Sequence, residues 1–185
     1  EGGEDGGGGE DGGGGEGGEG GTFFDKLADC AGVDPPPNGR ASAQHPGFRS
    51  PTGQVVIADV RFTAHPGEAA ALLAFLRSER MPGCYARIYQ EGIVRGREAR
   101  GLPGEVGRTS FDEQPFDALG DDVFAFRVTT PTGPPDPQPQ QVVDWVYVQV
   151  GRANVTMAFI GAGEHFDPPE MVRLTRLVVD RIPVG

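Results

Sequence analysis

Two cysteines are the residues of this chain best suited to chemistry: Cys30 in FFDKLADCAG and Cys84 in RMPGCYARIYQ. A thiolate can act as a nucleophile, as a metal ligand or, after oxidation, as half of a disulfide. A structural zinc site needs four nitrogen or sulfur ligands, and His45, His65 and His165 show no ligand spacing with either cysteine. A catalytic thiol needs a neighbouring base, and no sequence feature selects a histidine for that role. We therefore favour a Cys30–Cys84 disulfide, with two free buried thiols as the alternative.

A disulfide between these cysteines has consequences for the compartment and for stability. Disulfides persist in oxidising compartments, so the pairing predicts an extracytoplasmic protein. Closing a loop of this length stabilises a fold by about 4 kcal/mol on the chain-entropy model. The bond would join the N-terminal helix to the beginning of the third helix.

Other side chains form no recognisable catalytic motif. None of the four serines lies in a G-x-S-x-G context, and neither H-E-x-x-H nor G-K-[ST] occurs. Asp59, Asp144 and Glu164 could form acid–base pairs in space, but no sequence feature selects a pair. Solvated or structurally paired carboxylates are the simpler interpretation. We expect no catalytic residue, no metal and no cofactor.

Composition divides the chain into a tail and one domain. Residues 1–21 consist of 14 glycines and 7 acidic residues, which predicts a disordered tether. Such a spacer is expected between a membrane anchor upstream of residue 1 and an outward-facing domain, or alternatively between two domains of a longer chain. Residues 22–185 form the expected single domain, and its net charge of −4, against −11 for the whole chain, argues against a nucleic-acid partner.

Hydrophobic periodicity predicts an α+β fold, an antiparallel sheet with helices packed on it in the order α-β-α-α-β-β-β-β-α. The segment VDPPPNGRASAQHPG is predicted to be irregular. Asp167 is the expected N-cap of the last helix, with Glu170 completing a capping box and Ile182 on the buried side. We expect helices at about 23–30, 67–80, from 84 onward and after Pro168, and strands at 54–62, 104–111, 122–130, 141–150 and 153–160.

The last two strands yield a candidate binding face. A two-residue turn at Gly151 and Arg152 would fix their register, and a four-residue loop would leave the same faces, whereas a three-residue loop would not. One face then carries the pairs Val150–Ala153, Val148–Val155, Val146–Met157 and Asp144–Phe159, and the other carries Gln149–Asn154, Tyr147–Thr156 and Trp145–Ala158.

The second of these faces mixes aromatic surface with hydrogen-bonding groups, as a ligand cleft does. We expect Trp145, Tyr147 and Thr156 to line a groove, joined by Arg127 from the neighbouring strand. The alternative is that a helix covers Trp145 and Tyr147 as ordinary core.

An ordered set of motifs carries a family resemblance. LADCAG, then VVIADVRFTAHPGEAAALLAFL, a second cysteine heading a helix, and WVYVQVGRANVTMAFIG before a C-terminal helix together resemble a large group of actinobacterial envelope proteins. This group includes secreted lipoproteins and the extracellular sensor domains of mycobacterial serine/threonine kinases, and its fold is similar to the PsbP-like α+β sandwich. The resemblance covers about residues 22–183.

The resemblance implies a non-enzymatic, extracytoplasmic binding or sensor domain, anchored to the outer face of the cell membrane or secreted. Its expected partner is a small-molecule, lipid or cell-wall ligand. The kinase sensor domains carry two disulfides, whereas this chain can form only one, which favours the lipoprotein branch. The alternative function is an envelope hydrolase or transferase with an unrecognised active site.

Overall fold

The chain folds into an antiparallel sheet with helices on both faces. The computed structural model describes residues 22–37, 39–44, 47–51, 53–102, 105–132, 140–162 and 165–183. The predicted tether at residues 1–21 lies outside the described residues. In chain order, the elements of the described part are α1 (Phe23–Ala31), β1 (Ala41–Gln44), β2 (Phe48–Arg49), β3 (Val55–Phe62), α2 (Pro66–Leu76), α3 (Met81–Glu98), β4 (Ser110–Glu113), β5 (Asp122–Pro131), β6 (Gln140–Val150), β7 (Ala153–Ala162) and α4 (Pro168–Val179).

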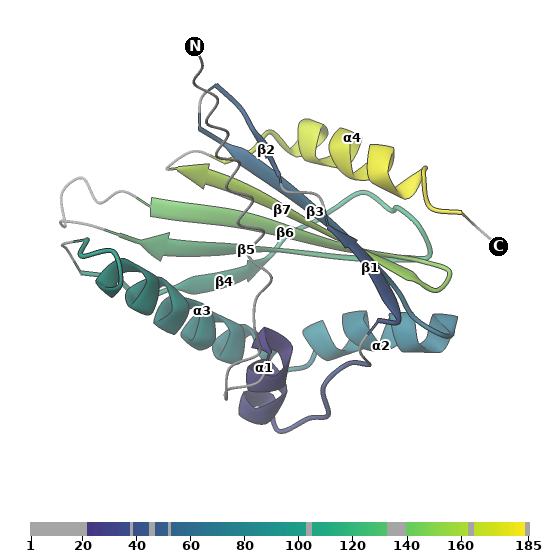
Figure 1. Cartoon of the computed structure of the whole chain (residues 1–185), viewed down its shortest axis with the longest axis horizontal. Coiled ribbons are helices and arrows are strands. Elements are labelled where there is room, and N and C mark those ends of the chain that lie inside the picture. Colours follow the sequence, from purple (N-terminus) through teal and green to yellow (C-terminus); the bar gives the residue numbers. More distant parts are fainter. Residues whose placement is uncertain are drawn as a thin grey trace, which may run out of the picture.

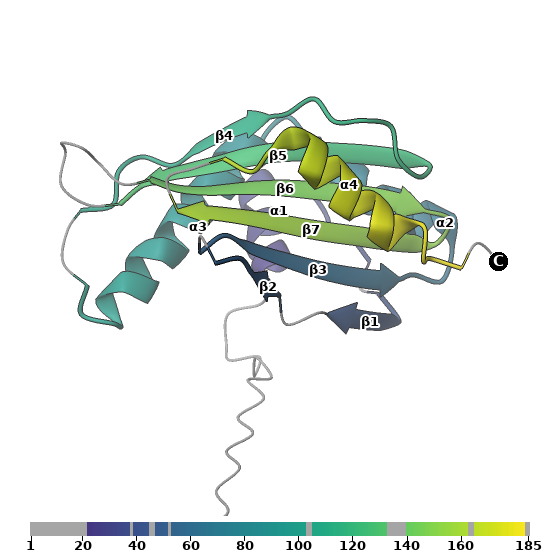
Figure 2. The ribbon, with the colours of Figure 1, turned by 90° about the horizontal axis from the view of Figure 1, so that it is seen from above.

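The strands of the described residues form one seven-stranded sheet, so the predicted α+β class is confirmed. Six strands follow the order β1-β3-β7-β6-β5-β4, and β2 pairs with β3. Figure 1 shows α1, α2 and α3 on one side of the sheet and α4 on the other. Figure 2, turned by 90°, shows α4 lying across the strands.

The first helix forms where it was predicted, and a capping box begins it. The Thr22 hydroxyl accepts a hydrogen bond from the Asp25 N–H at 3.2 Å, and the Asp25 carboxylate accepts one from the Thr22 N–H at 2.6 Å. Gly32 ends the helix with a φ of 70°, which glycine adopts without strain, and donates its N–H to the Ala28 carbonyl. Leu27, Ala28 and Ala31 form the buried side of this helix.

The short strand β1 lies in the segment 33–47 that was predicted to be irregular, so that prediction is wrong there, and β2 follows the segment directly. β1 pairs with β3, where Gln44 lies opposite Asp59, and β2 places Phe48 opposite Val56. Every residue of β1 is exposed, and Phe48 is 67% exposed. Neither strand therefore shows the alternation of buried and exposed residues that identifies a strand in a sequence. Both form because β3 offers an open edge.

The boundary between α2 and α3 also differs from the prediction. α2 ends at Leu76 instead of residue 80, and α3 begins at Met81 instead of Cys84. Pro82 lies in the first turn of α3, where its missing N–H leaves no helical hydrogen bond unmade. Arg77 follows α2 and donates to both carboxylate oxygens of Asp122 at 2.6 and 2.8 Å, which ties this junction to β5.

The strand predicted at residues 104–111 is displaced toward the C-terminus. β4 covers Ser110–Glu113, and Val106 makes only an isolated bridge with Thr132. Phe111 anchors this edge strand by stacking on Phe126, with ring centroids 4.3 Å apart. Residues 112 and 113 of β4 are acidic, so the strand lacks the apolar alternation by which a strand is predicted from a sequence.

The last helix begins at its predicted N-cap, but the predicted capping box does not form. Asp167 makes no side-chain cap hydrogen bond. Pro169 removes one of the N–H groups that an N-cap side chain would bind, because it lies in the second helical position. Glu170 instead pairs with Arg173 at 2.7 Å. Ile182 lies beyond the end of the helix, although it packs against the same group of buried side chains as Met171 of the helix.

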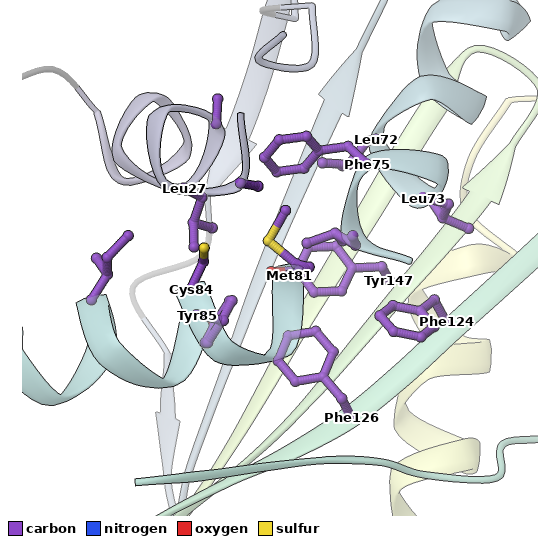
Figure 3. Close-up of a cluster of buried hydrophobic side chains, with 14 of the residues drawn as sticks. Leu27, Leu72, Leu73, Phe75, Met81, Cys84, Tyr85, Phe124, Phe126 and Tyr147 are labelled. Atoms are coloured by element: carbon purple, nitrogen blue, oxygen red, sulfur yellow. The ribbon is translucent and has the colours of Figure 1, made fainter. Parts of the chain in front are cut away.

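Two hydrophobic clusters of the described residues lie on opposite faces of the sheet. The first joins α1, α2 and α3 to β5 and β6, and Figure 3 shows Leu27, Met81, Tyr85 and Phe126 within it. The second includes Met171 of α4 together with side chains of β6 and β7. The sheet thus has a helix-covered core on each side, and the pocket described below adjoins the first.

Candidate ligand-binding pocket

A disulfide joins Cys30 of α1 to Cys84 in the first turn of α3, which confirms the predicted pairing. The sulfur atoms are 2.02 Å apart, and the two Cα atoms are 5.8 Å apart. Both cysteines of the chain are thereby used, and neither is a free thiol. The bond fixes the short helix α1 beside α3, and these two helices provide one wall of the pocket.

The β6–β7 hairpin has the predicted register. Val150 pairs with Ala153 across the two-residue turn, and Gly151 has a φ of 55° while Arg152 does not have a positive φ. Tyr147 lies opposite Thr156, and the predicted partners Trp145 and Ala158 are also paired. The period of two along each strand then points these side chains to the face covered by α1 and α3.

A pocket of about 560 Å³ lies between α1, α3 and this face of the sheet. One cross-strand row of its floor runs from Gln44 through Asp59 and Thr156 to Tyr147, so the floor changes from polar to aromatic. The aromatic lining of the pocket consists of Phe23, Phe24, Tyr85, Tyr89, Trp145 and Tyr147.

The predicted residues Trp145, Tyr147 and Thr156 are brought together here, but they are not equally accessible. Tyr147 is only 3% exposed and belongs to the first buried cluster. Most of its ring is therefore ordinary core, as the alternative interpretation of this face expected. Tyr85 is a close neighbour in the same cluster, and the two residues are drawn in Figure 3. Trp145 and Thr156 are only partly buried. Trp145 Nε1 is itself buried, and no described residue accepts a hydrogen bond from it.

The tyrosine hydroxyls of the pocket stay neutral over the physiological pH range. Burial raises the pKa of Tyr89 to about 12. Burial also raises the pKa values of Tyr85 and Tyr147, and the neighbouring guanidinium of Arg61 lowers the pKa of Tyr147 in opposition. These groups offer neutral hydrogen bonds to a ligand and do not supply an anionic base.

The sequence prediction named Asp59 only as a possible acid–base partner and placed none of the charged residues of the pocket in the groove. Asp59 and Arg61 lie two apart on β3 and share the pocket face, and the Arg61 Nε atom donates to Asp59 Oδ2 at 2.8 Å. Lys26 of α1 and Arg95 of α3 also line the pocket. The alternation of polar residues in VVIADVRF was the available signal, since residues 57, 59 and 61 must share a face.

Arg127 does not join this pocket, so its predicted place in the groove is wrong. It pairs in register with Asp144, whose carboxylate accepts from Arg127 Nε at 2.7 Å. Both residues line a separate groove of about 590 Å³ beside α4. The reason is the period of two along β5: Phe126 and Val128 face the first cluster, and residue 127 faces away.

The described residues contain no group of three or more His, Cys, Asp or Glu that could hold a metal ion. No helix in the described part of the chain is long and apolar enough to cross a membrane. Compared with known proteins, the chain matches no protein-family model and no curated protein sequence.

Proposed function

We propose that this chain is a non-enzymatic, extracytoplasmic binding or sensor domain that holds a small molecule in the pocket between α1, α3 and the sheet. The observation that carries the proposal is the pocket's size and lining. Its volume of about 560 Å³ lies within the usual range of small-molecule sites. Six aromatic residues provide apolar area, and a few polar groups at one end provide orientation.

The arrangement of charges supports binding in preference to catalysis. Asp59 is the single carboxylate among the described residues that line the pocket, and its Oδ2 atom already accepts a hydrogen bond from Arg61. A general acid–base mechanism commonly uses a pair of titratable groups that converge on one point, and this pocket supplies no free pair.

The disulfide supports an oxidising, extracytoplasmic compartment. The resemblance to actinobacterial envelope lipoproteins and kinase sensor domains, with their PsbP-like sandwich, supports the same compartment. In this proposal the domain is held at the outer face of the membrane by an anchor upstream of residue 1, or is secreted. Its ligand is a small molecule, a lipid or a cell-wall fragment.

The test is to place a larger side chain on the floor of the pocket and to measure the binding of a dye. Thr156 of β7 points into the pocket, whereas Thr129 of β5 is equally half-buried and lies on the other face of the sheet. The neutral fluorophore N-phenyl-1-naphthylamine is titrated into each protein, and energy transfer from Trp145, the only tryptophan, locates the bound dye.

We expect Thr156→Phe to weaken binding of the dye at least about tenfold, because the new ring occupies the apolar space. Thr129→Phe, the matched control, should bind like the wild type. Failure of the wild type to bind the dye, or equal affinity in wild type and Thr156→Phe, would overturn the proposal.

A further inference from the structure

The guanidinium of Arg61 lies at the polar end of the pocket, and its side chain is 46% exposed. Its Nε atom donates to Asp59 Oδ2 at 2.8 Å, and its central carbon lies 5.8 Å from the ring centroid of Phe24. These two contacts come from different elements, β3 and α1. Because they use Nε and one face of the group, they leave the two Nη atoms available, and no described residue accepts a hydrogen bond from either.

Three of the four charged residues that line the pocket are basic, in contrast with the rest of the chain. Lys26 and Arg95 line the same pocket, and neither forms an ion pair with a described residue. Asp59 is the one acidic residue among the described residues of the lining. The pocket therefore carries a positive excess in a protein whose formal net charge is −11. Such a local field favours an anionic ligand over a neutral or cationic one.

We infer that the ligand is an amphipathic anion, with an apolar or aromatic body and a carboxylate, sulfonate or phosphate head group. The head group accepts hydrogen bonds from the two Nη atoms of Arg61, whose planar fork suits a two-oxygen acceptor. The body lies against Tyr89, Ile93 and Trp145. This inference rests on the proposed binding function and adds the charge and shape of the ligand.

Two dyes that share one body provide the test. 1-Anilinonaphthalene-8-sulfonate has the same body as N-phenyl-1-naphthylamine and adds one sulfonate. We expect the wild type to bind the sulfonate dye about tenfold more tightly than the neutral dye, the usual size of one charge-assisted interaction. Raising the ionic strength should weaken binding of the sulfonate dye alone.

Arg61→Gln should abolish this preference by weakening the sulfonate dye much more than the neutral dye, whereas Arg61→Lys should restore part of it. Arg49→Gln is the control, because it removes the same charge from β2, outside the lining of the pocket. Circular dichroism of each variant checks that it is folded.

The outcomes separate the two proposals. Equal binding of both dyes by the wild type, or an unchanged preference in folded Arg61→Gln, would overturn the anionic head group and leave the binding pocket standing. Equal loss of preference in Arg49→Gln and Arg61→Gln would also overturn it, by showing that net charge alone acts. Absence of binding by either dye would instead contradict the proposed function.

Discussion

Tyr85, Tyr89 and Tyr147 are the only tyrosines of the chain, and all three line the pocket. An unfolded chain would ionise them near pH 10. Burial raises the pKa of Tyr89 to about 12 and raises those of the other two. The folded state thus favours the neutral phenols, and this contribution to stability is fully present below about pH 10. It is lost as the pH rises through about 12.

This shift gives a prediction for alkaline solution. The free energy of unfolding should be insensitive to these tyrosines below about pH 10 and should then fall as the pH rises, because the unfolded chain releases their protons first. In a titration followed by absorbance at 295 nm, tyrosinate should appear late and together with loss of the circular dichroism signal. The chain in guanidinium chloride is the control and should titrate near pH 10. Ionisation of all three near pH 10 in folded protein would contradict their burial.

Residue-level chemistry was only partly predictable from the sequence. Trp145 and Thr156 were correctly placed together, because a two-residue turn at Gly151 determines every pair along the hairpin. Arg127 was misplaced because no short turn motif in the sequence sets the register of β5 against β6. The sequence therefore did not determine which residues of β5 share a face of the sheet with Tyr147. Arg61 was missed because its role depends on Asp59 and Phe24, and the docking of Phe24 is a long-range event.

At the scale of elements, α1 is joined covalently to α3. It has nine residues, fewer than an isolated helix needs to be stable in water, and it buries Leu27, Ala28 and Ala31 in the first cluster. It also supplies Phe23, Phe24 and Lys26 to the pocket. The sequence predicted this helix because its apolar periodicity is a local signal. It predicted the disulfide because two cysteines can pair in only one way. It did not predict β1 and β2, whose formation depends on the edge of β3.

Replacing both cysteines by serine should separate these contributions of α1. The two cysteines are 54 residues apart, so Cys30→Ser/Cys84→Ser should lower the free energy of unfolding by about 4 kcal/mol. Affinity for N-phenyl-1-naphthylamine should fall as well, because α1 undocks more readily and carries part of the pocket wall with it. Chemical denaturation and the dye titration measure the two effects. Unchanged dye affinity in the destabilised variant would show that α1 stays docked without the disulfide.

At the scale of the whole molecule, one sheet serves two cores. β6 contributes Tyr147 to the first cluster and Val146 to the second, so adjacent residues of one strand lie in different cores. Loss of packing on the α4 side should therefore destabilise the pocket side through shared backbone hydrogen bonds. Trp145 packs against the first cluster, and Met171 belongs to the second. A probe on one face can thus report on packing at the other.

Met171→Ala tests whether the two cores unfold as one. Met171 is 5% exposed, so its truncation should lower the free energy of unfolding by about 2–5 kcal/mol. Leu177→Ala is the control on the same helix, because Leu177 is 43% exposed and should change stability little. In urea, the fluorescence of Trp145 and the far-UV circular dichroism should shift to lower concentration together, since a shared sheet couples the layers. A circular dichroism transition that moves while Trp145 fluorescence stays at its wild-type midpoint would mean that α4 unfolds separately, and the pocket would then be a property of α1, α3 and the sheet alone.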